Sequence, residues 1–185
     1  MQLAIFDTMD ESKSIIILSG PIGAGKTTVA QELIKLLPGP LVYIEGDCFW
    51  KHIVKAREGF EGKQNLRMTS AATFAAAMPY ALYGHTVLLD FAFTPSALKK
   101  ALELAAKRQI PIKYIVLRPD MDVCASRAAN RKEWAFTEYD EPLQRLYHAF
   151  DSVQSHTIYD NTSDAIEIAA KIIEGLDERV FDAKG

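Results

Sequence analysis

Short apolar runs alternate along the chain with segments in which apolar residues recur every three or four positions. The apolar runs predict strands at Ser14–Ser19, Leu41–Glu45, Thr86–Asp90, Ile112–Leu117 and His156–Tyr159. The other pattern predicts helices at Lys26–Leu37, Phe49–Arg57, Thr69–Tyr83, Pro95–Arg108, Asp120–Arg131, Pro142–Phe150 and Ser163–Leu176. Buried strands that alternate with helices are typical of an α/β fold, in which a parallel sheet carries helices on both faces. Ligands of such folds bind at the carboxyl ends of the strands.

Some segments between these elements predict breaks. Gly59–Leu66 is polar and contains glycine, so we expect a loop there. Pro79 lies inside the third predicted helix and is expected to kink or divide it. Residues 177–185 follow the last helical pattern, and we expect them to fray.

The composition is that of an ordinary globular domain. The chain has 185 residues, 49% hydrophobic and 24% charged, and a domain of this size needs no disulfide or metal to be stable. Its net charge of −3 argues against a protein whose main task is holding long nucleic acid. Cys48 and Cys124 form no metal or redox motif, and neither a membrane-spanning run nor a signal-peptide pattern occurs. We therefore expect a single cytoplasmic domain over residues 1–185.

The strongest motif follows the first predicted strand. Residues 20–27, GPIGAGKT, match the phosphate-binding pattern G-x-x-x-x-G-K-[ST] between an apolar strand and a helix. Such a loop turns backbone N–H groups toward a polyphosphate, and the helix N-terminus adds partial positive charge. The predicted nucleotide-binding residues here are Gly20, Gly23, Ala24, Gly25, Lys26, Thr27 and Thr28. Lys26 would reach the β- and γ-phosphates, Thr27 would ligate Mg²⁺, and Thr28 would donate to the α-phosphate. The alternative is a glycine-rich turn without a ligand.

Two carboxylates follow apolar strands at the edge where ligands bind. Asp47 comes just after the second strand and can accept the proton of an attacking hydroxyl, or position the metal through water. Its alternative role is to cap the next helix. Asp90 ends the third strand and is a predicted metal residue that holds Mg²⁺ or its water. The alternative for Asp90 is a carboxylate that only begins a loop.

Three arginines are candidates for contact with the nucleotide. Arg127 and Arg131 are one helical turn apart, and Arg118 ends the fourth predicted strand. Guanidinium groups stack on adenine, bind phosphate and neutralise charge on a transferring phosphoryl group. The alternative is a solvated helix face on which Arg127 and Arg131 pair with Asp122 or Glu133.

The segment Cys48–Ser70 has five Lys or Arg against two Glu, a charge of +3 in a chain of −3. It predicts a pocket for an anionic or polyhydroxylated acceptor, with Asp47, Trp50, Arg57 and Arg67 as the substrate-binding residues. A solvated surface is the alternative.

Residues 131–142 combine charge with the aromatic side chains of Trp134, Phe136 and Tyr139. We expect a small lid that closes over the site and excludes water, because an open kinase site would hydrolyse ATP. The alternative is a loop that these aromatic side chains simply anchor.

In this order the motifs resemble the nucleoside-monophosphate-kinase-like branch of P-loop kinases. That branch includes shikimate kinase, gluconate kinase, adenylate kinase, chloramphenicol phosphotransferase and polynucleotide 5′-kinase domains. The resemblance covers about residues 15–175 and rests on SGPIGAGKTT, IEGD, VLLD, SRAANR and YDNT, which begin at positions 19, 44, 87, 126 and 159. Cys48-Phe49-Trp50 stands where gluconate kinase has His-Pro after Gly-Asp.

The resemblance implies a three-layer P-loop NTPase fold with a five-stranded parallel sheet in order 2-3-1-4-5, and ATP with Mg²⁺ as the phosphoryl donor. It implies that Arg127 packs against adenine, that Arg131 acts in the lid, and that the loop with Asn161 touches the base. It also implies that Asp47 lies beside the acceptor hydroxyl.

The leading functional hypothesis is a small-molecule kinase that moves the γ-phosphoryl group of ATP to a hydroxyl of a sugar acid, a shikimate-like acid or an antibiotic. Lys26, Asp47 and Arg131 are its predicted catalytic residues. The alternatives are a nucleic-acid 5′-end kinase and a non-catalytic ATP-binding regulatory module. We expect a small-molecule acceptor rather than nucleic acid or a membrane as partner, and a monomer or homodimer.

Overall fold

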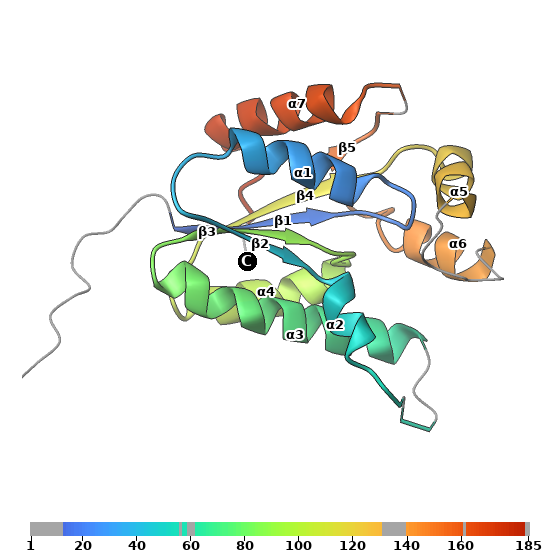
Figure 1. Ribbon diagram of the computed structural model, residues 1–185, viewed down its shortest axis with the longest axis horizontal. Helices are drawn as coiled ribbons and strands as arrows, with labels where there is room; N and C mark the ends of the chain where they lie inside the picture. Colours follow the sequence, from blue (N-terminus) through green and yellow to red (C-terminus); the bar gives the residue numbers. More distant parts are fainter. Residues whose placement is uncertain (1–12, 56, 59–61, 131–139, 161, 184–185) are drawn as a thin grey trace, which may run out of the picture.

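Figure 1 shows the computed structural model, in which a central sheet lies between two layers of helices. The structure describes residues 13–55, 57–58, 62–130, 140–160 and 162–183. The strands are β1 (Ser14–Ser19), β2 (Leu41–Glu45), β3 (Thr86–Asp90), β4 (Ile112–Leu117) and β5 (Thr157–Ile158). Their order is β2-β3-β1-β4-β5, and every neighbouring pair is parallel. The predicted α/β fold and strand order are confirmed.

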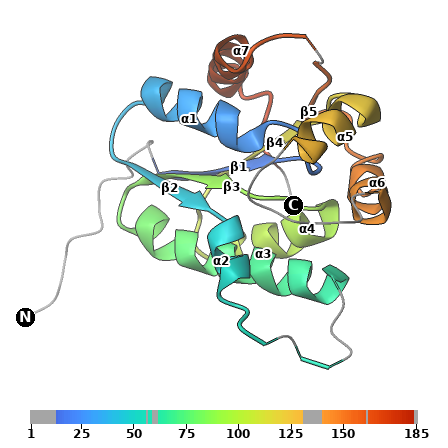
Figure 2. The same cartoon turned by 45° about the vertical axis from the view of Figure 1, so that its right-hand side comes forward.

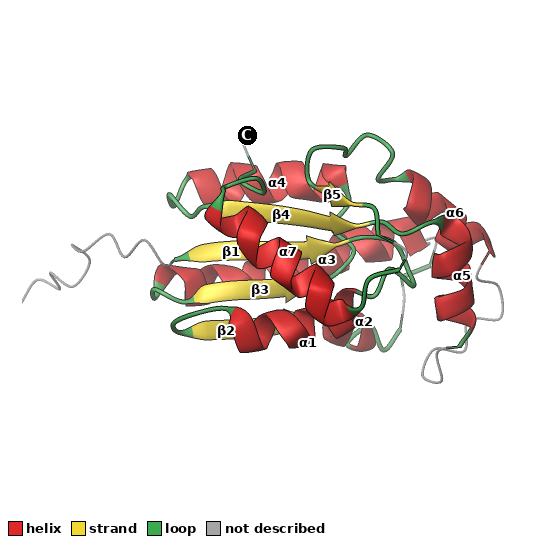
Figure 3. Ribbon diagram, turned by 90° about the horizontal axis from the view of Figure 1, so that it is seen from above, coloured by secondary structure: helices red, strands yellow, loops and turns green. Residues whose placement is uncertain are grey.

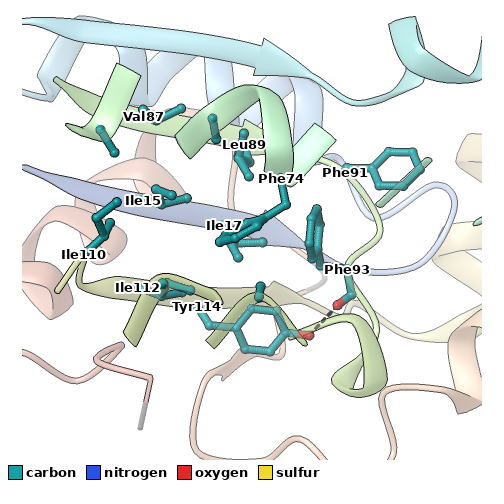
Figure 4. Close-up of a cluster of buried hydrophobic side chains, with 14 of the residues drawn as sticks. Ile15, Ile17, Phe74, Val87, Leu89, Phe91, Phe93, Ile110, Ile112 and Tyr114 are labelled. Carbon is teal, nitrogen blue, oxygen red and sulfur yellow. Dashed lines mark hydrogen bonds between the residues drawn. The ribbon is translucent and has the colours of Figure 1, made fainter. Parts of the chain in front are cut away.

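Each face of the sheet has its own hydrophobic core, because successive strand residues point to opposite faces. Ile15 and Ile17 of β1 pack in the cluster shown in Figure 4, on the side of α3 (Gly62–Leu82) and α4 (Pro95–Ala106). Ile16 and Leu18 pack in the other cluster, beneath α1 (Lys26–Leu36) and α7 (Ala165–Asp177). Figure 3 shows α1 and α7 lying across the sheet.

Three short helices lie at the edge where the strands end (Figure 2). They are α2 (Asp47–Lys51), α5 (Met121–Ala129) and α6 (Asp140–His148). A small separate cluster of Cys124, Ala128 and Leu143 joins α5 to α6. Within the described residues, no helix combines the length and apolar character needed to cross a membrane.

The segment after β3 is held to the centre of the sheet. The carbonyl oxygen of Phe93 accepts a hydrogen bond from the Ser19 hydroxyl at 2.9 Å and one from the Tyr114 hydroxyl at 2.6 Å, the latter drawn in Figure 4. All three residues are buried. A buried hydrogen bond of this kind contributes about 1 kcal/mol to stability, and two of them fix the course of the chain beside Asp90.

The α3 region differs from the sequence prediction. The helix begins at Gly62 rather than Thr69, so the predicted loop is wrong from Gly62 onward. The polar residues 63–65 resemble a loop in sequence, but Leu66 beside them packs against the core. Pro79 does not divide the helix, which continues to Leu82.

Helix α2 also differs from its prediction, since it ends at Lys51 rather than Arg57. Val54, inside the predicted range, is 88% exposed and contributes nothing to a buried helix face.

The chain end is ordered where fraying was expected. Phe181 is buried in the core beneath α1 and α7. Its carbonyl accepts from the Tyr114 N–H at 2.9 Å, and Asp182 forms an antiparallel bridge with Lys113. The prediction of fraying is therefore wrong for residues 178–183, because one aromatic side chain and a strand edge fix them.

Candidate nucleotide and acceptor site

The loop between β1 and α1 has the backbone that a phosphate cradle requires. Gly20 and Gly23 have φ values of +141° and +79°, which residues other than glycine rarely adopt. A Cβ atom at Gly20 would lie 2.2 Å from the carbonyl oxygen of Leu117, and one at Gly23 would lie 2.0 Å from that of Cys124. At these two positions the loop is thus packed directly on the end of β4 and on α5, with no room for a side chain.

Lys26 and Thr27 begin helix α1, whose first N–H groups have no partner within the helix. The Lys26 ammonium donates to the carbonyl of Pro21 at 2.9 Å, so its charge lies over the same loop. Ala24 of the loop is buried, and Thr28 is exposed. Lysine charge, helix dipole and convergent N–H groups together make this loop suited to bind polyphosphate.

Asp90 lies at the end of β3 and is 3% exposed. It accepts a hydrogen bond from the Tyr43 hydroxyl at 3.2 Å, and the Thr27 hydroxyl lies near enough to lower the pKa of its carboxyl. Burial raises the pKa of the Asp90 carboxyl, and the charge of Lys26 with the two hydroxyl donors opposes that shift. The strand-ending carboxylate is therefore a partner of the phosphate loop and not only the start of another loop.

The described residues fit a magnesium ion. Mg²⁺ takes oxygen ligands and usually binds through one or two protein groups together with water and substrate phosphates. The Thr27 hydroxyl and the Asp90 carboxylate are such groups, and both line the same cavity. Among the described residues, no three His, Cys, Asp or Glu side chains gather as a metal cage. This donor set suits an ion that arrives with the nucleotide.

The turn after β2 brings Asp47 to the same edge. The Gly46 N–H donates to the carbonyl of Asp90 at 2.9 Å, which ties the end of β2 to that of β3. A Cβ atom at Gly46 would lie 2.4 Å from the ring of Phe91, so this approach requires glycine. Gly46 itself is the N-cap of α2, and Asp47 is in the first turn without a capping hydrogen bond. The capping alternative for Asp47 is therefore wrong.

Glu45 adds a third carboxylate to this edge, opposite Asp90 in the sheet register. Partial burial, then the charges of Asp90 and Asp47, raise the pKa of the Glu45 carboxyl. Repulsion among the three carboxylates favours the binding of a cation at this edge, or the uptake of a proton by one of them.

A cavity of about 580 Å³ joins these groups. Its lining includes Lys26, Thr27, Asp47 and Asp90, together with residues of α3, of the segment after β3 and of α6. The predicted acceptor residues Trp50 and Arg67 line it, whereas Arg57 is exposed and lies outside the lining. The structure thus brings the predicted phosphate, metal and proton-accepting residues into one space with two of the predicted substrate residues.

Arg127 lies on α5 beside the phosphate loop. Its Nη1 atom would be 3.8 Å from a Cβ atom placed on Gly25, which is compatible with contact to a bound nucleotide. Arg131, Asn161 and most of the predicted lid at 131–142 fall outside the described residues. Their assignments remain predictions.

Arg118 has a structural task. Its guanidinium carbon lies 4.3 Å from the ring centre of Tyr147, and Asp151 accepts a hydrogen bond from it. It holds α6 and the following turn to the end of β4.

The loop before α7 is built around one carboxylate. Asp160 accepts from the N–H groups of Thr162 and Ser163 at 3.0 and 2.8 Å, and from the Lys171 ammonium at 2.6 Å. These donors hold the pKa of Asp160 well below its usual range, with the Lys171 hydrogen bond as the largest cause. These hydrogen bonds tie Asp160 to the residues just before α7 and to Lys171 within it.

Sequence reasoning missed three parts of the site. It gave no role to Tyr43, to Arg145 of α6 or to the wall at residues 91–97. Tyr43 could have been found, because an aromatic side chain two residues before a strand end reaches diagonally to the neighbouring strand. Arg145 carried no local signal.

Comparison with known proteins places this geometry in a family. Residues 15–155 match the family described as AAA domain. The chain is a member of the AAA domain family. A search of curated proteins gave no match.

Solved structures share the fold of this AAA domain protein. The gluconokinase from Sinorhizobium meliloti 1021 is 20% identical with a TM-score of 0.64, covering 91% of this chain and 94% of that one. The shikimate kinase from Acinetobacter baumannii, in complex with shikimate, is 21% identical with a TM-score of 0.62, covering 91% and 96%. The APS kinase from Mycobacterium tuberculosis, in complex with AMPPNP and APS, is 24% identical with a TM-score of 0.61, covering 90% and 98%. The resemblance to the P-loop kinase fold is confirmed.

Proposed function

We propose that the protein transfers the γ-phosphoryl group of ATP to a hydroxyl of a small molecule. The single observation that carries this proposal is that one cavity of about 580 Å³ is lined by Lys26 and Thr27 of the phosphate loop and also by Asp90 and Asp47. A nucleotide phosphate at one end and an acceptor at the other would meet beside the Asp47 carboxylate. The kinases that share the fold act on shikimate, gluconate or APS by their names, which supports phosphotransfer in general.

The phosphate loop would bind and orient the donor. Lys26 and the first N–H groups of α1 supply positive charge where the β- and γ-phosphates would lie. Arg127 is proposed to contact the adenine side of the nucleotide, as its place beside Gly25 supports. When bound at Thr27 and Asp90, Mg²⁺ would neutralise charge on the phosphate oxygens. Most of the rate in phosphoryl transfer comes from such positioning and charge stabilisation.

Asp47 would act on the acceptor. Its carboxylate would accept the hydroxyl proton as the acceptor oxygen forms a bond to the γ-phosphorus. The bond from the γ-phosphorus to the bridging oxygen breaks, ADP keeps that electron pair, and the proton passes from Asp47 to solvent. Arg131, if the resemblance holds at the lid, would add charge to the transferring group.

The test is ADP release with ATP and Mg²⁺ in the presence of sugar acids, shikimate, nucleosides, antibiotics and 5′-hydroxyl oligonucleotides. We expect one class of small molecule to stimulate release, and Lys26→Ala to remove the stimulation. A 5′-hydroxyl oligonucleotide as the best acceptor would instead favour an end kinase. Tight ATP binding with no stimulation by any acceptor would contradict the proposal and favour a non-catalytic module.

A further inference from the structure

The contact between Phe91 and Gly46 requires glycine for space and not for conformation. Gly46 has a φ of −67° and a ψ of −24°, a right-handed helical conformation that other residues adopt equally well. A Cβ atom at Gly46, however, would lie 2.4 Å from Cγ of Phe91 and 2.5 Å from both its Cβ and its Cδ2 atoms. The Phe91 side chain therefore lies directly against the main chain of residue 46.

Gly46 leads directly into the carboxylate that is proposed to accept the proton. Asp47 is the next residue and the first of helix α2, which is only five residues long. Helix α2 has no side-chain capping hydrogen bond at its start and no buried residue. A helix this short is not stable by itself, since isolated helices of fewer than about 12 residues are marginal in water. Contacts with other elements must therefore fix the place of Asp47.

Two contacts tie the start of α2 to the end of β3. The Gly46 N–H donates to the carbonyl of Asp90 at 2.9 Å, and Phe91, the residue after Asp90, supplies the side chain that lies against Gly46. A hydrogen bond tolerates a range of angles, so by itself it leaves residue 46 some freedom to turn. A ring in van der Waals contact with the main chain removes that freedom. The direction in which the Asp47 side chain leaves the helix depends on both contacts.

The Phe91 ring is itself held in place. Phe91 is 4% exposed and meets the Phe93 ring edge to face, with 6.3 Å between the ring centres. Phe93 in turn meets the ring of Phe74 of α3 edge to face at 6.4 Å. Figure 4 shows the three rings, with Phe91 at the edge of the cluster. Edge-to-face pairs of this kind are favourable, so Phe91 is a fixed support and does not follow the movements of α2.

Phe91 lies where a small displacement would affect the chemistry. Phe91, Asp47 and Asp90 all line the cavity of about 580 Å³. Displacement of a reacting group by about 1 Å can lower a reaction rate by about 100-fold. Support of Asp47 by a buried ring is therefore large enough in its effect to be measured.

We propose that Phe91 is a positioning residue for Asp47. Its Cβ, Cγ and Cδ2 atoms support the main chain of Gly46, and this support keeps the Asp47 carboxylate at the cavity beside Asp90. The role of Asp47 as proton acceptor rests on the proposed function, whereas the support of the turn can be measured without any transfer.

The first test uses the atoms that touch Gly46. Phe91→Ala removes Cγ and Cδ2, whereas Phe91→Leu keeps a carbon at each of these positions. At saturating ATP, Mg²⁺ and the best acceptor, we expect Phe91→Ala to lower the single-turnover rate about 100-fold, and Phe91→Leu to restore most of it. Affinity for a non-hydrolysable ATP analogue should stay unchanged in both variants. The matched control is Phe74→Ala, which removes a buried ring of the same core from outside the lining of this cavity and is expected to keep the rate.

Gly46→Ala changes the same contact from the other side. Its methyl group would overlap the Phe91 side chain, and we expect a rate loss similar to that of Phe91→Ala. In the double variant Gly46→Ala/Phe91→Ala, the methyl group occupies space that the ring has left, so we expect a rate about tenfold or more above that of Gly46→Ala. A wild-type rate in Gly46→Ala, additive losses in the double variant, or equal rates in Phe91→Ala and Phe74→Ala would overturn the inference.

Amide hydrogen exchange separates this inference from the proposed function. Exchange of the Gly46 N–H, which reports its hydrogen bond to Asp90, is measured by NMR on the full chain relative to the N–H of Val29 in α1. We expect the relative protection of Gly46 to fall about tenfold in Phe91→Ala and to stay unchanged in Phe74→Ala. This loss of protection, with no transfer by the wild type to any acceptor, would uphold the support of the turn and contradict the proposed function. Transfer by the wild type, with unchanged protection in Phe91→Ala, would overturn the inference and uphold the kinase.

Discussion

The hydroxyl of Tyr43 donates a hydrogen bond of 3.2 Å to the carboxylate of Asp90, from one strand to a diagonal position on its neighbour. Burial, followed by the Asp90 charge, raises the pKa of Tyr43, so the hydroxyl keeps its proton and remains a donor. This hydrogen bond therefore orients the carboxylate that is proposed to hold Mg²⁺.

Tyr43→Phe is expected to loosen this carboxylate without changing the packing of the ring. The Mg²⁺ concentration that gives half-maximal binding of a non-hydrolysable ATP analogue should rise by roughly tenfold, as is typical when a group that orients a metal ligand is lost. Tyr83→Phe is the matched control, because Tyr83 is 76% exposed. An unchanged Mg²⁺ requirement in Tyr43→Phe would show that Asp90 is oriented without it.

Asp47→Asn tests which carboxylate accepts the proton. Turnover with the best acceptor is expected to fall by about 100- to 10,000-fold, while affinity for the ATP analogue stays about the same. Glu45→Gln is the informative comparison, since Glu45 is two residues away at the same edge and its pKa is raised. A larger loss in Glu45→Gln than in Asp47→Asn, measured as single-turnover rates, would move the proton-accepting role to Glu45.

Gly23→Ala tests the contact between the phosphate loop and α5. The new Cβ atom would meet the Cys124 carbonyl at 2.0 Å, in addition to the strain of a positive φ, which alone costs about 1–3 kcal/mol. We expect a marked loss of stability in urea unfolding and loss of ATP binding. Gly39→Ala is the control, because Gly39 also has a positive φ, +76°, but no atom lies within 4 Å of its added Cβ. Equal destabilisation of both variants would show that α5 moves away from the new Cβ atom without a loss of stability.

Asp160 gives a prediction about pH. Its pKa is lower in the folded protein than in the unfolded chain, where the ordinary value is 3.8. The stabilisation that its ionised form contributes is therefore complete well above pH 4 and decreases as the pH falls toward the folded-state pKa. The wild type is expected to exceed Asp160→Asn in free energy of unfolding by more at pH 6 than at pH 3. A difference that does not change between these pH values would contradict the carboxylate's role in holding the loop.

Much of the fold could be predicted because the signals are local. Strands such as Ser14–Ser19 have an unbroken apolar stretch, here residues 15–18, and the phosphate-loop motif lies between this strand and a helix. That combination also located Asp47 and Asp90, since strand ends meet at one edge of a parallel sheet. The confirmed strand order came from the resemblance, not from any pattern in the residues.

The rest depended on contacts between distant residues. Residues 63–65 are polar, and only the packing of Leu66 on the core shows that α3 has already begun. Arg145 reaches the cavity because Arg118 and the α5 contact place α6 there, which no local pattern encodes. Phe181 is ordered through β4, more than sixty positions earlier in the chain.

The double hydrogen bond to the Phe93 carbonyl has a consequence for how acceptor preference can diverge. The anchor uses a main-chain oxygen, with Ser19 and Tyr114 as donors from β1 and β4. Residues 94–97 follow this anchor and line the cavity with their side chains. Substitutions there would change the shape and polarity that an acceptor meets, while the backbone that carries them stays in register with the phosphate loop. Selection for a new acceptor can therefore act on this wall without disturbing the part of the molecule that handles ATP.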